Sequence, residues 1–267
     1  MIVINLESGF WSGMKKSPQA IHNAALAGKA KDKRLSGSVK LLNSKEMKSI
    51  VTFLSSVRKV LQDNTLPIPA GRLAVHSNGV KTPEEIILFL RESKITLAQH
   101  VSAFLAVYSD EKKRAEKELG DYFDASQFPA AESLAKKFYL EFSTSPFVDT
   151  VSPEFQGVME KAMRDSIDRA FQMSVKDLFS RVYEQAQKAI ASLGGKSFKQ
   201  NTLDNIKQTS EIIRALNITQ HAGIEEFASK LEKLGKLDAA NLRENENDKS
   251  LAVSDLQKIV NDLEGMI

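Results

Sequence analysis

The chain has 267 residues, of which 42% are apolar and 27% are charged, and this composition is typical of a globular protein. The absence of cysteine excludes disulfide bonds, thiolate metal sites and a cysteine nucleophile. No apolar run approaches the ~20 residues of a membrane-spanning helix, and the N-terminal stretch lacks the features of a signal peptide. We therefore expect a soluble, cytoplasmic protein that does not contact a membrane.

The net charge of +3 hides an uneven distribution along the chain. Residues Lys15 to Arg72 contain twelve Lys or Arg against three acids, which gives +9, whereas residues 73–267 carry −5. A basic segment on a mildly acidic body is typical of a nucleic-acid surface, of a solvated face, or of a patch complementary to a neighbouring subunit. Residues 29–40, inside the basic segment, contain Gly and Ser and predict a mobile loop.

Two stretches of the N-terminal third are the strand candidates. Residues 1–8 alternate weakly between apolar and polar, and residues 66–76 contain two prolines that the interior of a helix does not accommodate. These stretches could pair as a small β-ribbon. Between them, apolar residues at helical spacing predict a helix over residues 44–62, with Asn43 or Ser44 as its cap.

A long helix is predicted over residues 83–119. Thr82 precedes Pro83, and Glu85 completes a capping box, in which Thr and Glu satisfy each other's free backbone amides. The pattern then continues without Gly or Pro until Gly120, which can adopt the left-handed conformation that ends a helix.

A second long helix is predicted over residues 153–193, with Ser152 as its cap and Gly194 at its end. A shorter helix is predicted over residues 130–142. After residue 195 the pattern changes to three short amphipathic segments, and the polar residues 236–250 read as an exposed link between the last two of them.

Two helices near 40 residues greatly exceed the mean of ~11–12 residues, and helices of that length usually pack as an antiparallel hairpin or a coiled coil. We therefore predict a predominantly all-α fold in which helices 83–119 and 153–193 pack against each other. The small β-ribbon precedes this hairpin, and a C-terminal helical appendage follows it. The predicted domains are residues 1–195 and residues 196–267.

The sequence contains no recognisable catalytic constellation. Gly195-Lys196-Ser197 lacks the first glycine of a phosphate-binding loop and follows a helix, so it reads as a helix stop. Asp165 and Asp168 alternate with arginines on a helix, where surface ion pairs are the ordinary explanation. No histidine has a partner three or four residues away that would place two metal ligands on one helix face; the four are His22, His76, His100 and His221. We expect no enzyme activity, no cofactor, no metal and no small-molecule substrate.

Several short motifs occupy fixed places in the first 195 residues. They are Phe10-Trp11-Ser12-Gly13-Met14-Lys15-Lys16, Phe104 to Tyr108, Ala115 to Gly120, Phe123, Phe128-Pro129, Lys137-Phe138 and Pro146 to Val148. They resemble the Trp-x-Gly-x-Lys start and the Phe-Leu-x-x-Tyr, Leu-Gly-x-x-Phe, Tyr-Pro and Lys-Phe motifs of a family of phage and mobile-element proteins known only as a bacterial domain of unknown function. Phe128 replaces the Tyr of the family, and the last Pro of its Pro-Val-Pro element is missing.

The resemblance implies a shared helical fold and a phage or prophage setting, and it carries no established catalytic residues. Some relatives are encoded near MoxR-like AAA+ ATPases, which implies an adaptor or a substrate of such a machine. Our leading hypothesis is therefore a non-catalytic helical interaction or assembly protein that forms a homo-oligomer or docks on a protein partner.

The alternative hypothesis is a nucleic-acid-binding accessory protein in phage recombination or replication. Trp11 lies beside two glycines and just before two lysines, so it could stack on a base, although a buried anchor is the more ordinary role for a Trp. The residues predicted to contact nucleic acid or a partner are Trp11, Lys15, Lys16, Lys29, Lys31, Lys33, Arg34 and Lys40.

Overall fold

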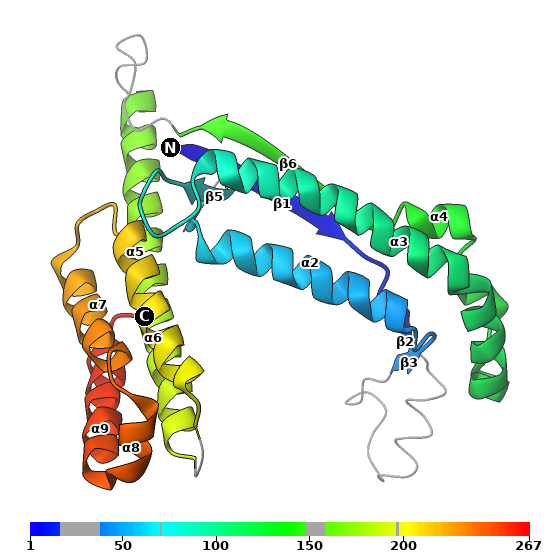
Figure 1. The fold of residues 1–267 in the computed structure, drawn as a ribbon. Coiled ribbons are helices and arrows are strands. Elements are labelled where there is room, and N and C mark those ends of the chain that lie inside the picture. Colours follow the sequence, from blue (N-terminus) through cyan, green and yellow to red (C-terminus); the bar gives the residue numbers. More distant parts are fainter. Residues whose placement is uncertain (17–37, 70, 148–157, 196–197) are drawn as a thin grey trace, which may run out of the picture. The chain divides into compact units, whose positions relative to one another are not determined.

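The computed structural model describes residues 1–16, 38–69, 71–147, 158–195 and 198–267 (Figure 1). The described part of the chain is 67% helical and also contains a small antiparallel sheet, so the prediction of a predominantly helical fold is confirmed. In chain order the elements are β1 (Ile2–Gly9), β2 (Met14–Lys16), β3 (Ser38–Lys40), α2 (Lys45–Asp63), β4 (Leu66–Ile68), β5 (Gly71–Ala74), α3 (Pro83–Leu119), η2 (Gly120–Tyr122), η3 (Ala125–Gln127), α4 (Ala131–Ala135), β6 (Tyr139–Pro146), α5 (Val158–Leu193), α6 (Gln200–Leu216), α7 (Ala222–Gly235), α8 (Ala239–Glu244) and α9 (Glu246–Leu263).

The chain divides into two compact units, and each is built from separate stretches of sequence. Unit 1 comprises residues Met1–Asn5, Val60–Ile87 and Ser143–Ile267, and unit 2 comprises residues Leu6–Lys59 and Leu88–Phe142. The elements β1, α2, α3 and β6 each contribute residues to both units. These units differ from the domains 1–195 and 196–267 that we predicted.

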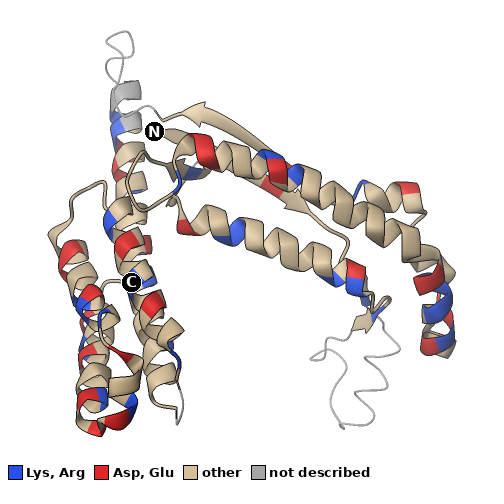
Figure 2. Ribbon diagram, in the orientation of Figure 1, with Lys and Arg blue, Asp and Glu red and all other residues tan. Residues whose placement is uncertain are grey.

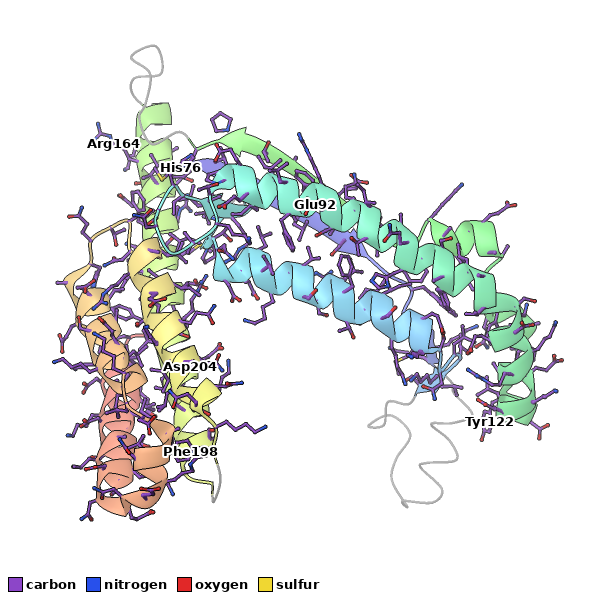
Figure 3. All side chains as sticks on the ribbon, viewed as in Figure 1. His76, Glu92, Tyr122, Arg164, Phe198 and Asp204 are labelled. Carbon is purple, nitrogen blue, oxygen red and sulfur yellow. The ribbon has the colours of Figure 1, made fainter. Side chains whose placement is uncertain are left out.

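The core of unit 1 is built around α5. This helix packs against α6, α7, α9 and β4, and the first three lie beside it in Figure 1. Its residues Leu178, Val182, Ala186 and Leu193 are almost completely buried in one continuous apolar cluster with those neighbours. Phe198, which precedes α6 and is labelled in Figure 3, is buried in the same cluster. The predicted C-terminal appendage therefore shares its core with the second long helix.

The predicted hairpin of the two long helices is not confirmed. Helix α5 and the first turn of α3 belong to unit 1, whereas the rest of α3 belongs to unit 2. The apolar face of α5 that was expected to meet α3 is covered by α6, α7 and α9.

The sheet has four strands in the order β4-β5-β1-β6. Strands β1 and β5 are antiparallel, with Ile2 opposite Ala74 and Ile4 opposite Arg72. The first strand candidate is confirmed as β1. The second forms two strands, β4 and β5, which pair with Leu66 opposite Leu73, so the predicted two-stranded ribbon is a larger sheet.

One predicted helix is wrong beyond its first turn. Residues 130–142 were expected to be helical, but α4 ends at Ala135 and strand β6 begins at Tyr139. In β6 the buried Leu140 alternates with the exposed Tyr139 and Glu141, which is the period of a strand with one covered face. Pairing beside β1 therefore outweighs the local helix signal of this stretch.

The predicted ends of α3 are confirmed. The Glu85 amide donates to the Thr82 hydroxyl at 3.3 Å, and the Thr82 amide donates to a Glu85 carboxylate oxygen at 2.7 Å, which is a complete capping box. At the other end, Gly120 has a φ of 51°, a left-handed conformation that a residue with a β-carbon rarely adopts.

The predicted exposed link over residues 236–250 is also wrong. It contains helix α8 and the start of α9, and its residues Ala239 and Leu242 are buried in the core of unit 1. The carboxylate of Asp238 accepts from the first amides of α8, and the side chain of Asn245 does the same for α9. Asp and Asn are strong helix caps, so these polar residues begin helices in place of forming a loop.

Unit 2 has a separate aromatic interior. Phe104 of α3 is fully buried, and its ring contacts Phe138 and Tyr108 at centroid distances of 5.7 Å. Helix α2 lies against α3, where the ring of Phe53 contacts that of His100 at 5.2 Å. Among the described residues, no helix is long and apolar enough to cross a membrane.

Candidate functional site

The basic residues that the structure describes near the N-terminus lie on a short ribbon formed by β2 and β3. The strands are antiparallel, with Met14 opposite Lys40 and Lys15 opposite Val39. Alternate residues of a strand share a face, and so do directly opposed residues, which places Met14, Lys16 and Lys40 together. Lys15 lies on the other face. All three lysines and Met14 are exposed, so the ribbon presents a basic face with one apolar side chain.

Lys15 lies near an acidic turn in unit 2. Hydrogen bonds from the hydroxyl of Ser126 and the amide of Gln127 lower the pKa of Asp124, and the charge of Lys15 adds a smaller effect in the same direction. The Nζ of Lys40, on the other face, donates to Asn43 at 2.9 Å. The remaining predicted contact residues, Lys29, Lys31, Lys33 and Arg34, lie outside the described residues.

Trp11 packs beside the ribbon within unit 2. It is half-buried, and its ring meets Tyr108 edge to face at a centroid distance of 6.4 Å. A β-carbon added at Gly13 would lie 3.7 Å from the Trp11 ring and 2.9 Å from Met47, so this glycine permits the close approach. Tyr108 in turn donates to the carbonyl of Pro129 at 2.9 Å. Trp11 thus ties the start of the chain to α3.

A groove of about 440 Å³ lies in unit 2 between α3 and β6. Helix α3 contributes Leu97, Val101 and Leu105, which recur at the spacing of one helix face. Phe138 and Leu140 form the opposite wall. The groove is therefore lined mainly by apolar side chains, although it lies at the surface.

Two further apolar residues of α3 lie at the surface of unit 2. Ile95 is 63% exposed and Leu88 is 56% exposed, and their separation of seven residues places both on one side of the helix. At the rim of the groove, the Lys94 Nζ and a Glu141 carboxylate oxygen form an ion pair at 2.6 Å. This pair joins α3 to β6, the strand at one edge of the sheet.

The last turns of α3 carry both charges in close alternation, as Figure 2 shows. Arg114 pairs there with Glu111 and, at 3.7 Å, with Glu118. Pairs of this kind three and four residues apart support a solvated helix, and we assign them that structural role.

Each described histidine contacts a different residue. His76 approaches Glu84 at 3.7 Å, His100 approaches the hydroxyl of Ser49 at 3.3 Å, and His221 meets the ring of Phe179 at 5.4 Å. His22 lies outside the described residues. In the part of the chain that the structure describes, no three His, Cys, Asp or Glu side chains come close enough to hold a metal ion.

Two arginines of unit 1 have a structural role. Arg72 and Arg181 both donate to the carbonyl of Thr65, at 2.9 and 2.8 Å, just after the end of α2. Arg181 also pairs with Asp177 at 2.7 Å. Burial lowers the pKa of Arg72, and its guanidinium donates to the Thr65 hydroxyl as well as to the carbonyls of Gln62 and Thr65. Cations at the C-terminal end of a helix stabilise its free carbonyls.

The chain matches no known family, no curated protein and no solved structure. The candidate sites therefore depend on the geometry alone. The basic residues of the ribbon were predicted from the sequence, but its strands were not: residues 38–40 were expected in a mobile loop and instead form β3. The groove was not predicted either. The sequence signal near it is the pair Leu88 and Ile95, two apolar residues of α3 that do not share the buried positions of Ile86, Leu90 and Leu97.

Proposed function

We propose that the protein is a non-catalytic interaction protein that docks on a protein partner through the groove of unit 2. The observation that carries this proposal is the apolar groove beside α3, with Ile95 and Leu88 exposed on the same helix. Exposed apolar surface of this kind marks protein interfaces, because water is released when a partner covers it.

Three features of the groove support a protein partner. Its walls are aliphatic and aromatic, which suits an apolar side chain of a partner. The small residues Ala98, Ser102 and Ala135 leave room between the two walls. The Lys94–Glu141 pair supplies a polar rim. An apolar centre with a polar rim is the usual organisation of a protein interface.

The partner and its setting are part of the proposal. The resemblance to phage and mobile-element proteins favours the cytoplasm of a phage host, and a MoxR-like AAA+ ATPase is the first partner to test. A second copy of the chain is the other partner that the sequence analysis predicts.

Affinity capture of partners tests the proposal, provided that the substitutions change the surface at the groove and leave the buried core residues unchanged. The purified chain is used to capture partners from the infected host, and Leu88→Asp/Ile95→Asp and Ser102→Trp variants are compared with it. We expect each variant to lose the partner, with affinity reduced by about tenfold or more in reconstitution with the purified partner. A Thr52→Asp/Ser56→Asp variant adds the same charge to an exposed face of α2 and should bind normally. A partner that binds all four chains equally would contradict the proposal.

A second candidate function is nucleic-acid binding through the basic segment. The specific observation in its favour is the exposure of Lys15, Lys16 and Lys40 on one small ribbon. Lysines in such a position contact phosphates, so we expect little sequence preference.

Salt dependence tests this second function. Affinity should fall with a log–log slope of about −0.9 per duplex phosphate neutralised, or about −0.7 on single strands. Replacing Lys15, Lys16 and Lys40 with Ala should reduce both affinity and slope, and so should replacing Lys29, Lys31, Lys33 and Arg34. A control that removes Lys176, Lys199 and Lys207 from unit 1 should change neither. If gel shifts at low salt show no complex with DNA or RNA, this function is excluded.

A further inference from the structure

Unit 1 contains a second apolar hollow, unrelated to the groove of unit 2. It has a volume of about 400 Å³ and lies between the end of α7, α8 and α9. The buried Leu234 and Leu242 line it, and Leu237 and Leu251 lie at its margin. Leu251 is 64% exposed, so much of this apolar surface faces solvent.

The charged residues around this hollow are mainly acidic. Asp238, Asp248 and Asp255 line it, and Lys233 is the one basic residue among its lining. Asp238 and Asp248 accept hydrogen bonds from neutral donors, which leave their negative charges in place. Asp255 pairs with Lys258 at 3.1 Å on the surface. The stretch 237–267 as a whole has seven acids and three basic residues.

The ribbon of β2 and β3 has the opposite chemistry. Its Met14 is 52% exposed, and Lys16 and Lys40 flank it on the same face. We propose that the ribbon of one copy docks in the acidic hollow of a second copy. Met14 then covers Leu251, and the two lysines lie beside Asp255 and its neighbouring aspartates.

This assignment follows from the apolar side chain and the opposite charges that the two surfaces present. Methionine is unbranched and flexible, so it fills an irregular apolar hollow well. Lysines around it are attracted by the aspartates, and this attraction weakens as salt shortens the Debye length from about 10 Å at 0.1 M to about 3 Å at 1 M. Since an exposed ion pair contributes little by itself, the contact should form at high protein concentration and low salt.

The proposed contact joins two different surfaces, so it is heterologous. Each added copy leaves one free ribbon and one free hollow, and the assembly grows as a chain or closes as a ring. A two-fold dimer would instead use the same surface on both copies. The inference goes beyond the docking groove of unit 2 and does not depend on it.

Two variants, each altered in one half of the contact, test the proposal by light scattering. The ribbon variant is Lys16→Ala/Lys40→Ala, and the hollow variant is Leu251→Lys/Asp255→Lys. The wild-type mass should rise with concentration beyond that of two chains, and it should fall when salt is added. Each variant alone should remain monomeric. An equimolar mixture should form pairs and stop there, because it offers one intact ribbon and one intact hollow.

Matched controls change the same charge elsewhere. Lys15→Ala/Lys48→Ala removes two lysines away from the proposed face. Ser254→Lys/Glu264→Lys adds the same positive charge to α9 and to the residue that follows it. Both controls should assemble as the wild type does. Circular dichroism should show that all variants are folded.

A monomeric wild type, a mixture that stays monomeric, or variants that assemble normally would overturn the proposal. Loss of assembly in the Leu88→Asp/Ile95→Asp variant would also overturn the proposal, because that result assigns the self-contact to the groove of unit 2. Conversely, if a partner binds the groove and has the same affinity for the ribbon variant as for the wild type, the proposed function is supported. That conclusion holds whether or not the ribbon mediates self-association.

Discussion

The two long helices differ in what covers them. Helix α3 has 37 residues and α5 has 36, and both show an apolar stripe at helical spacing. In unit 1, three helices and a strand cover α5, and its buried residues join one continuous core. In unit 2, α3 keeps Leu88, Ile95 and one side of a groove in contact with solvent. Similar stripes therefore lead to different surfaces, and the uncovered one is the better candidate for binding.

The largest expected effect contrasts the same kind of substitution on the two helices. Val182 of α5 is fully buried, and an unpaired carboxylate there should cost about 3–5 kcal/mol of unfolding free energy. Ile95→Asp on α3 should change it by less than about 0.5 kcal/mol, because that side chain already faces water. Urea denaturation of Val182→Asp and Ile95→Asp measures both. Equal losses would show that α3 is covered as completely as α5.

The next effect concerns the close approach of α6 and α7 in unit 1. A β-carbon at Gly235 would lie 2.7 Å from the backbone nitrogen of Lys207, and backbone atoms cannot move aside as a flexible side chain can. Gly235→Ala should therefore cost about 1–3 kcal/mol, although Ala is the better helix former. Thermal unfolding measures this loss. A stabilised Gly235→Ala protein would show that the helices of unit 1 pack less tightly than described.

A smaller effect is expected at the start of α3. Thr82→Ala removes the hydroxyl that accepts the Glu85 amide, and the loss of such a cap typically costs about 1 kcal/mol. Thr82→Ser keeps the hydroxyl and should retain most of the stability. Chemical denaturation of both variants separates the cap from the rest of the side chain. If Ala and Ser were equivalent, the capping box would not contribute.

The smallest effect is a pH dependence within unit 1. Hydrogen bonds from Lys236 and Arg214 lower the pKa of Glu232 to about 2 from an ordinary 4.5. A lowered folded-state pKa stabilises the protein above the unfolded-state pKa, and this contribution disappears as the pH falls from about 4.5 to about 2. The melting temperature of Glu232→Gln should therefore lie below that of the wild type at pH 6, and the two should converge near pH 2. A constant difference across this range would contradict the assignment.

Local signals in the sequence predicted several ends of elements correctly. The capping residues before α2 and α3 and the glycine after α3 act through atoms only a few residues away, so the sequence alone is sufficient there. Strand β1 was also found from its alternation. The prediction failed at β6, where the partner strand β1 lies more than a hundred residues earlier and no local feature announces it.

The pairing of long helices and the groove could not be predicted for a related reason. An apolar stripe shows that a helix is covered but does not say by what, and α5 is covered by helices that follow it in the chain. Phe171 of α5 is only half-buried, beside Phe147, with 6.5 Å between the ring centroids. Of the candidate sites, the basic residues followed from composition, whereas the groove depends on the placement of β6.

The order of the strands has a consequence for synthesis. Strand β1 lies between β5 and β6 in the sheet, yet it leaves the ribosome before both of them. At about 5–20 residues per second, β1 waits on the order of ten seconds for the neighbour that completes its pairing. During that time Val3 and Ile4, which end up buried, are unprotected, together with the backbone edges of the strand. The nascent chain is thus most prone to aggregate before residue 146 emerges, and slower elongation between β1 and β6 would lengthen that interval.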